Sequence, residues 1–213
     1  MTDALRLLSR GDPVMAQLIR RAGPYCPQPD RQRSPYESLV RAVAHQQLTG
    51  KAATTILGRF CALYGGESYP APEQLVATPD EQLRAAGFSR AKAASLKDIA
   101  AKTLDGTIPE RRVLSRLPDE AIIERLTEAR GVGRWTAEMF LMFTLGRPDV
   151  LPVDDYGICN GFRIAYGKRK LPKPKVLANF GERWAPYRTT ASWYLWRAVD
   201  FYREKKQRAA QEK

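Results

Sequence analysis

The chain has 213 residues, 44% hydrophobic and 27% charged, which is the composition of an ordinary soluble globular protein with an ample core. A net charge of +12, from 35 Lys and Arg against 23 Asp and Glu, favours a polyanionic partner, with nucleic acid as the leading one. The longest apolar run, Met139 to Phe143, is too short to span a bilayer, and the N-terminus lacks a secretory signal, so we expect a cytoplasmic protein without a membrane partner, associated with the nucleoid if the source is bacterial.

The first half of the chain shows helical patterns with recognisable starts. The motif Ser34-Pro35-Tyr36-Glu37 is a capping box with proline at the first helical position, and the apolar positions that follow recur at helical spacing as far as Leu48. Residues 78–81 (Thr-Pro-Asp-Glu) repeat this signature and predict a short helix that Gly87 ends. Ser89 is the expected cap of the next helix, over about 91–102.

The second half continues this pattern. Pro118-Asp119-Glu120 opens a helix, and a long last helix includes Pro186 and the aromatic run over 193–196, then ends in a basic tail at about 203–213. Residues 168–175 form a basic loop punctuated by prolines. Period-two alternation is absent, so the predicted fold class is all-α, with two helical lobes and a cleft between them.

A glycine hairpin lies between two of these helices. Gly131 and Gly133 flank one apolar residue, so the chain can turn here with positive φ and without a Cβ in the way. Backbone N–H groups here and at the helix start near Arg134 would bind a DNA phosphate, which positions a protein without reading base sequence. A plain helix–helix turn is the alternative; the net charge and the following residues, Trp135 and Thr136 among them, favour phosphate binding.

A pair of carboxylates, Asp154 and Asp155, follows Pro152. One of them is expected to cap the helix that begins at Tyr156, and the other could face the cleft. A carboxylate fixed beside a sugar stabilises the oxocarbenium-like charge that develops when an N-glycosidic bond breaks, and it can orient the attacking water.

Two of the four tryptophans, Trp135 and Trp196, are candidates for function. Trp135 begins a helix beside a backbone turn, which is an unusual place for a purely structural ring. Enzymes that act on a base take it out of the stack and hold it between flat side chains. For Trp184 and Trp193 we expect a place in the hydrophobic core.

The residue types that hold metals are sparse. The cysteines Cys26, Cys61 and Cys159 include no C-x-x-C pair, which argues against a zinc or iron–sulfur site and favours reduced apolar fillers. The one histidine, His45, is expected to pack or lie on a helix surface. We therefore expect no cofactor and no metal bound by side chains.

Five motifs occur in a fixed order, namely R-A-V-A-H-Q-Q-L (41–48), G-F-S-R-A-K (87–92), R-G-V-G-R-W-T-A (130–137), L-P-V-D-D-Y (151–156) and W-A-P-Y-R-T-T-A-S-W-Y-L-W-R (184–197). With them, the chain resembles the helix–hairpin–helix DNA glycosylase superfamily, close to its DNA-3-methyladenine glycosylase II branch. The resemblance implies one glycosylase domain over 1–213, with the hairpin motif at about 122–145. It also implies the compact form that lacks the N-terminal β domain of the larger bacterial enzymes.

The resemblance also implies roles for individual residues. The catalytic aspartate corresponds to Asp155, with Asp154 as the runner-up. The base pocket and the DNA contacts correspond to two sets of residues: Trp135, Met139, Trp196 and Tyr156 for the base, and Gly131, Gly133, Arg134, Thr136, Lys92 and a wedge at Gln47 or Leu48 for DNA. In this family a monovalent cation often lies at hairpin carbonyls, here those of Arg130 and Gly133.

The implied activity is that of a monomeric, monofunctional glycosylase. It would bind double-stranded DNA with alkylated bases, flip out 3-methyladenine or 7-methylguanine and hydrolyse the N-glycosidic bond in base excision repair. Bifunctional relatives carry a Schiff-base lysine where this chain has Trp135, so no lyase activity is expected. Two alternatives remain: a non-catalytic helix–hairpin–helix DNA-binding module, and an oxidised-purine glycosylase, in which that lysine should be present.

Overall fold

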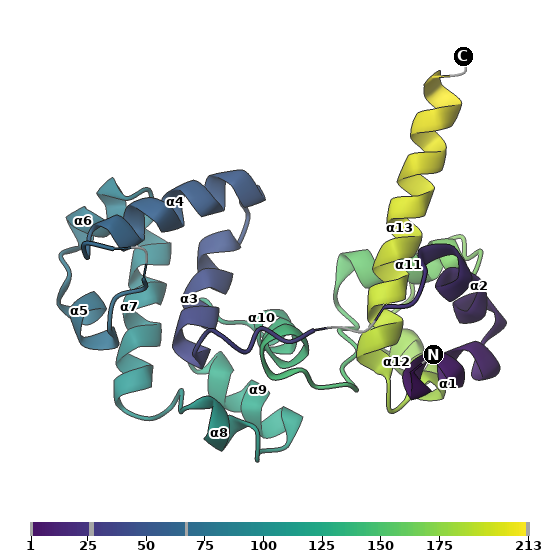
Figure 1. Ribbon diagram of the computed structural model, residues 1–213, viewed down its shortest axis with the longest axis horizontal. Helices are drawn as coiled ribbons and strands as arrows, with labels where there is room; N and C mark the ends of the chain where they lie inside the picture. Colours follow the sequence, from purple (N-terminus) through teal and green to yellow (C-terminus); the bar gives the residue numbers. More distant parts are fainter. Residues whose placement is uncertain (1, 26–27, 67, 212–213) are drawn as a thin grey trace. The chain divides into compact units, whose positions relative to one another are not determined.

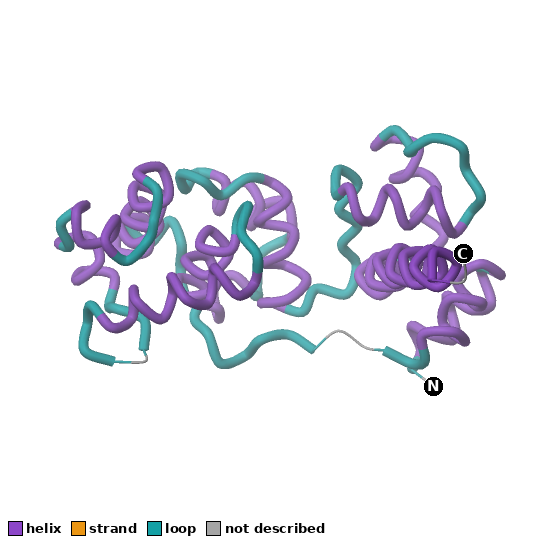
Figure 2. Tube along the Cα trace, turned by 90° about the horizontal axis from the view of Figure 1, so that it is seen from above, coloured by secondary structure: helices purple, strands orange, loops and turns teal. Residues whose placement is uncertain are grey.

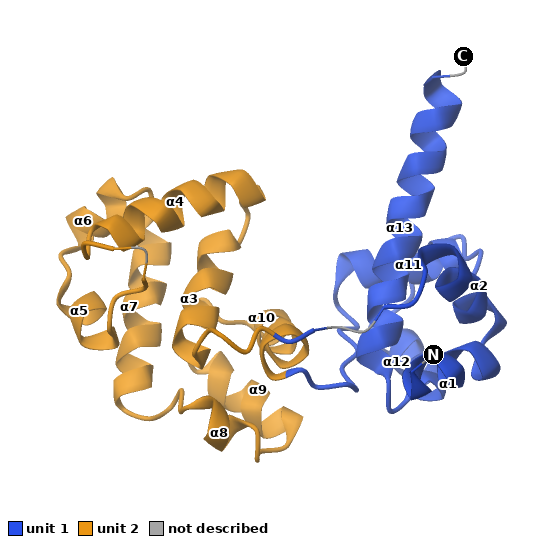
Figure 3. Cartoon of the chain, viewed as in Figure 1, with its two compact units in different colours: residues 1–29, 146–213 blue, residues 30–145 orange. Residues whose placement is uncertain are grey.

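The computed structural model describes residues 2–25, 28–66 and 68–211. All regular elements in these residues are helices joined by loops, as Figure 2 shows, which confirms the all-α prediction. The chain divides into two units, coloured in Figure 3: unit 1 combines Met1–Pro29 with Gly146–Lys213, and unit 2 is Asp30–Leu145. Among the described residues, no helix has both the length and the apolar character that crossing a bilayer requires.

Unit 2 contains the middle helices of the chain, labelled in Figure 1. They are α3 (Pro35–His45), α4 (Gly50–Ala62), α5 (Pro72–Ala77), α6 (Asp80–Ala85), α7 (Arg90–Leu104), α8 (Arg111–Leu114), α9 (Asp119–Thr127), α10 (Arg134–Phe140) and the π-helical turn η1 (Leu141–Leu145). The long helix α7 packs against α3, α5 and α6. Leu39 and Val43 of α3 and Leu96 and Ile99 of α7 are fully buried, so they form much of the core that fixes these two helices together.

The helix starts predicted for unit 2 are mostly confirmed. Ser34 forms the capping box, because its hydroxyl accepts from the Glu37 N–H at 3.2 Å and its own N–H donates to the Glu37 carboxylate at 2.7 Å. Ser89 caps α7 by accepting from the Lys92 N–H at 3.2 Å. The cap expected at Thr78 is wrong: this residue ends α5, and its hydroxyl donates back to the Gln74 carbonyl at 2.7 Å.

The first predicted helix is also shorter than expected. It ends at His45, and Leu48 is 39% exposed in the following turn instead of on the apolar helix face. The reason is local: Gln47 adopts φ +57, a left-handed conformation that cannot continue a right-handed helix.

Unit 1 is built from both ends of the chain. Its helices are α1 (Asp3–Gly11), α2 (Pro13–Ala22), α11 (Tyr156–Ala165), α12 (Pro174–Gly181), the 3₁₀ turn η2 (Glu182–Trp184) and α13 (Arg188–Gln211). Trp184 is fully buried and its indole N–H donates to the buried Asp12 carboxylate at 3.0 Å. The other oxygen of Asp12 accepts from the Val14 N–H at 3.0 Å and caps α2, so this one residue ties α2 to the distant η2 turn.

Three details of unit 1 differ from or extend the predictions. Pro186 lies before α13 and follows Ala185 through a cis peptide bond, so it is not part of the last helix. The basic segment after residue 203 continues α13 as far as Gln211, and Figure 1 shows this end of the helix extending past the rest of unit 1. Of the three cysteines, Cys61 and Cys159 are buried and free, as expected, and Cys26 lies outside the described residues.

Candidate active site

The carboxylate of Asp155 lies at the start of α11. Its Oδ1 accepts from the Ile158 N–H at 2.7 Å, which is the N-cap geometry for this helix. The same Oδ1 accepts from the indole N–H of Trp196, on α13, at 2.9 Å. Donors from two helices therefore fix the orientation of this partly buried carboxylate.

Two glycines of α11 bring the carboxylate and the indole together. A Cβ at Gly161 would lie only 2.0 Å from the Leu195 carbonyl oxygen, and one at Gly157 would lie 2.8 Å from Cδ1 of Trp196. Because both positions lack a side chain, α11 lies close to α13, against the Leu195 backbone at Gly161 and against the Trp196 ring at Gly157. The sequence contained a signal for this contact, since small residues four apart lie on one face of a helix and permit close approach.

From the sequence, one aspartate was expected to cap α11 and the other to be free for catalysis; the structure does not divide the roles in this way. The residue that caps α11 is Asp155, the same one that the resemblance assigns to catalysis, whereas Asp154 is exposed. Burial, followed by the charges of Asp155 and Asp154, raises the pKa of the Cys159 thiol. Cys159 therefore stays protonated beside the acidic pair, and its thiol donates to the Val153 carbonyl at 3.1 Å.

The hairpin of unit 2 turns at one glycine. Gly131 adopts φ +80, and a Cβ there would lie 2.5 Å from the Ser95 hydroxyl oxygen, so only glycine fits. Val132 points into the core and is 4% exposed. Gly133 does not share this conformation: its φ is −88, and it serves as the N-cap of α10. The space beside Gly133 is open, since no atom lies within 4 Å of where its Cβ would be.

The residues around the hairpin have partners within unit 2. The Arg134 guanidinium binds the Glu120 carboxylate through two hydrogen bonds, at 2.6 and 2.9 Å, and lies 3.3 Å from Glu138. The hydrogen bonds to Glu120 raise the pKa of Arg134 further above its ordinary value. The contact between Arg134 and DNA stays a prediction, and the structure gives this side chain a second role in fixing the start of α10.

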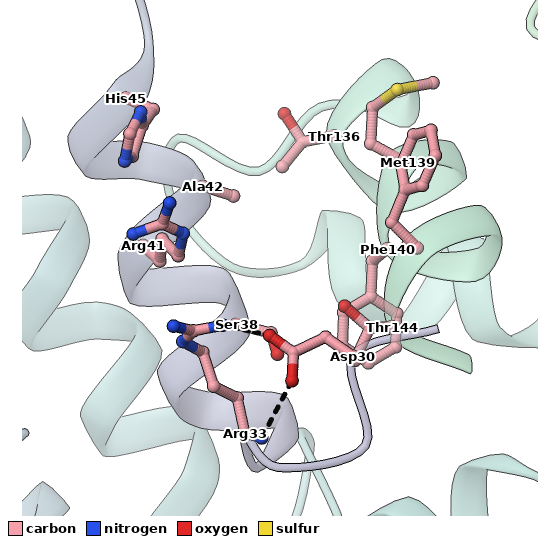
Figure 4. Close-up of a pocket in the computed structure, with 11 residues that line it drawn as sticks. Asp30, Arg33, Ser38, Arg41, Ala42, His45, Thr136, Met139, Phe140 and Thr144 are labelled. Carbon is pink, nitrogen blue, oxygen red and sulfur yellow. Dashed lines mark hydrogen bonds and ion pairs between the residues drawn. The ribbon is translucent and has the colours of Figure 1, made fainter. Parts of the chain in front are cut away.

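A pocket of about 220 Å³ lies in unit 2 between α3 and the helix formed by α10 and η1 (Figure 4). Met139 and Thr136 line one wall, and Ser38 and His45 line the other. Among the described residues, the Ser38 hydroxyl and His45 Nε2 are two of the few buried polar atoms without a hydrogen-bond partner. The pocket therefore combines apolar walls with polar groups that a ligand could satisfy.

From the sequence, His45 was expected to pack or to lie on a helix surface, and Ser38 was not singled out. Nothing in the pattern indicated that α3 faces a pocket. Burial, assisted by the charges of Arg41 and Lys92, lowers the pKa of His45, so the imidazole is neutral at pH 7. Asp30 closes one end of the pocket in Figure 4 and is hydrogen-bonded to Arg33. Desolvation raises its pKa, but hydrogen bonds from Gln32 and Arg33 lower it by more, so Asp30 carries a negative charge.

The remaining predicted base-pocket residues lie elsewhere in their units. Trp135 is 47% exposed at the start of α10 and does not line this pocket, while Tyr156 is 69% exposed at the start of α11. Trp196 is half-buried and donates its indole N–H to Asp155. Their contact with a flipped base stays a prediction.

The candidate ion sites differ in kind. The described residues contain no group of three or more His, Cys, Asp or Glu side chains that could hold a metal ion. At the hairpin, the Gly133 carbonyl accepts from the Ala137 N–H at 3.0 Å, and its second lone pair could still bind a monovalent cation together with the Arg130 carbonyl. Backbone carbonyls of this kind fit a hard cation.

The helix–hairpin–helix around Gly131 and the carboxylate at the start of α11 define a class of protein. Residues 40–186 match the family model of the HhH-GPD superfamily of base excision DNA repair proteins. The chain therefore belongs to this superfamily, as the sequence motifs predicted.

Individual relatives agree with this class. The chain is 43% identical to DNA-3-methyladenine glycosylase 1 of Schizosaccharomyces pombe over 92% of this chain and 87% of the relative. Among solved structures, it is similar to the 3-methyladenine DNA glycosylase of S. pombe in complex with abasic DNA, with a TM-score of 0.83, 43% identity and coverage of 92% of this chain and 95% of the other. A DNA-3-methyladenine glycosidase from Bacillus halodurans gives a TM-score of 0.84 at 37% identity, with coverage of 95% and 92%.

Proposed function

We propose that this protein is a monofunctional DNA glycosylase that excises alkylated purines, such as 3-methyladenine and 7-methylguanine, in base excision repair. The observation that carries this proposal is the Asp155 carboxylate, fixed at 2.9 Å by the Trp196 indole in a member of a base excision repair superfamily. Membership alone would also suit a non-catalytic DNA-binding module, but such a module needs no oriented carboxylate. The names of the similar proteins, DNA-3-methyladenine glycosylase and glycosidase, support the substrate class.

In this proposal the hairpin binds the DNA backbone. The exposed backbone at Gly133 and the N–H groups at the start of α10 would bind a phosphate, and the absence of a Cβ lets the phosphate approach closely. The carbonyls of Arg130 and Gly133 would hold a monovalent cation, which adds positive charge next to that phosphate. The net charge of +12 draws the duplex to the protein without regard to sequence.

The turn between α3 and α4 would separate the damaged nucleotide from its neighbours. Gln47 and Leu48 are both exposed, and a side chain that enters the base stack kinks the duplex and fills the gap left by the flipped base. Of the two, the left-handed Gln47 is the stronger candidate, because strained residues cluster at functional sites. The flipped base would be received by the unit 2 pocket, where Met139 forms one wall. Trp135, Tyr156 and Trp196 are further candidates for contact with the base.

Asp155 would act on the sugar. As the N-glycosidic bond breaks, its electron pair leaves with the base, and positive charge develops on the deoxyribose. The Asp155 carboxylate stabilises that charge and orients the water whose oxygen bonds to C1′ and whose proton is released. An N3- or N7-methylated purine is cationic, so it leaves as a neutral base and favours contact with electron-rich rings.

The product would be an intact strand with an abasic site. Strand cleavage by β-elimination needs an amine that forms an imine with C1′, and Trp135 has none. We further propose that the enzyme acts as a monomer, in the cytoplasm and on chromosomal DNA.

One assay tests the proposal. The protein is incubated with DNA treated with dimethyl sulfate, and released bases are identified by chromatography. We expect free 3-methyladenine and 7-methylguanine, with the strand broken only after alkali. Binding without base release would establish the non-catalytic module instead. Release of 8-oxoguanine with a nick that borohydride traps would establish an oxidised-purine glycosylase.

A further inference from the structure

The turn between α3 and α4 exposes a residue in a strained conformation. Gln47 is the only residue other than glycine with a positive φ among those that the structure describes. A long side chain in the left-handed region is unfavourable unless its surroundings hold it there. No glycine occurs at this position to relieve the strain, so the neighbouring contacts must maintain the turn.

Two polar side chains hold the backbone next to Gln47. The Lys92 ammonium, on α7, donates to the Ala44 carbonyl at 3.0 Å and to the Gln46 carbonyl at 2.6 Å. The Gln46 amide donates to the Gly131 carbonyl at 2.9 Å and lies 3.4 Å from the Thr136 hydroxyl. The carbonyl directly before Gln47 is therefore bound to α7, and the side chain directly before it is bound to the hairpin.

The position of Lys92 is itself well determined. Its backbone N–H is bound by the Ser89 cap, so the side chain begins from the first turn of α7. Burial lowers the pKa of Lys92, as expected of an ammonium turned toward the last carbonyls of a helix and away from solvent. These contacts give Lys92 an internal role that differs from the DNA contact expected from the sequence.

We propose that Lys92 and Gln46 are positioning residues for nucleotide flipping: they hold Gln47 in its left-handed conformation and couple that turn to the hairpin. The inference rests on the proposed function. Because Gln46 bridges to Gly131, the residue that enters the base stack and the backbone that grips the phosphate form one rigid assembly. A phosphate bound at the hairpin then places the turn at a fixed base step.

Loss of this coupling should affect nucleotide flipping more than DNA binding or bond cleavage. The hairpin and the net charge would still bind DNA, and Asp155 is not involved. The turn, however, could relax to an ordinary φ and point Gln47 elsewhere. The loss should be largest where flipping must break a sound base pair, and smallest where the pair is already disrupted.

The test compares single-turnover excision of 7-methylguanine opposite cytosine with excision opposite thymine, a mismatch. Lys92→Met and Gln46→Met remove the donors and keep the side-chain length. We expect each variant to lose about tenfold or more on the paired lesion and less than about threefold on the mismatched one, because disrupted pairs flip easily. Lys92→Arg, which keeps donors, should recover much of the paired rate.

Lys102→Met is the matched control, since it removes the same charge from the same helix, where Lys102 faces Glu128 at 3.8 Å. It should behave as wild type on both duplexes. A double variant, Lys92→Met with Gln47→Gly, should be no slower than Gln47→Gly alone, because glycine adopts this φ unaided.

The outcomes separate the two proposals. Equal losses on both duplexes, or no loss on either, would overturn the positioning role while the glycosylase activity stands. A wild-type protein that releases no base from either duplex would refute the proposed function, and the inference with it. Melting temperatures are measured for every variant. If Lys92→Met unfolds, Gln46→Met, at a half-buried side chain, gives the same comparison between the two duplexes.

Discussion

The two units build their candidate functional groups in opposite ways. In unit 1, Asp155 accepts two hydrogen bonds at the start of a helix whose glycines allow close approach to its neighbour. In unit 2, the important groups are an exposed strained turn, an open glycine and a pocket with unpartnered polar atoms. A carboxylate that stabilises a transition state must already be oriented, whereas groups that handle DNA gain their remaining partners from the ligand.

The largest effect should come from the unit 1 carboxylate. Asp155→Asn should lower single-turnover base release by about 100-fold or more, because the negative charge beside the sugar is lost. The fold should survive, since asparagine caps a helix as well as aspartate does. The measurement is release of 7-methylguanine at saturating enzyme, with DNA affinity measured in parallel and expected to change little.

Asp154→Asn is the control for this variant, because it removes a charge of the same sign one residue away. It should retain most of the activity, since Asp154 is exposed and does not cap α11. An inactive Asp154→Asn together with an active Asp155→Asn would move the catalytic role to the neighbouring residue.

The close packing of α11 on α13 gives the next effect. Gly161→Ala would place a Cβ 2.0 Å from the Leu195 carbonyl, and backbone at that distance must move. We expect a loss of about 2 kcal/mol in the free energy of unfolding, or a Tm lower by about 4–8 °C for a chain of this size. Excision should fall as well, because the shift separates Trp196 from Asp155.

Gly58→Ala on α4 serves as the matched control, since nothing lies within 4 Å of its Cβ position. This change should stabilise the protein by up to about 1 kcal/mol, because alanine favours an exposed helix more than glycine does. If both variants melt alike, close approach of α11 and α13 is not the reason for glycine at 161.

The same contrast explains what could be predicted from the sequence. Local signals were reliable: the Ser34 capping box and the Ser89 cap occur as expected, since each depends on residues within one turn. The catalytic assignment came only through resemblance, because an Asp pair after proline has no unique local meaning. Features that depend on distant partners could not be predicted from the sequence, such as the hydrogen bond from Gln46 to Gly131 across 85 positions. Thr78 was mistaken for a cap because a preceding helix offered its hydroxyl a better acceptor.

A smaller effect is expected from the hydrogen bond that supports the carboxylate. Trp196→Phe keeps an aromatic ring but removes the N–H that donates to Asp155 at 2.9 Å. Excision should fall about tenfold, near the lower end of the scale for one hydrogen bond to a charged group. The Ile158 N–H still holds the carboxylate, so the loss should be smaller than that of Asp155→Asn. A loss as large as that of Asp155→Asn would show that the indole acts on the base itself.

The smallest effect concerns the pocket of unit 2. Burial, with the charges of Arg41 and Lys92, lowers the pKa of His45 from its ordinary 6.5 in the folded protein. The unfolded chain therefore takes up a proton first as the pH falls, so the stability present above about pH 6.5 is lost progressively below it. His45 is the only histidine, so its imidazole resonance can be titrated by NMR without assignment by mutation. His45→Gln should reduce the fall in Tm between pH 7.5 and about 5.5, a window above the ordinary carboxylate range. An imidazole that titrates at or above 6.5 would mean that the pocket is hydrated and accommodates charge, which would make it a poor receptor for a cationic base.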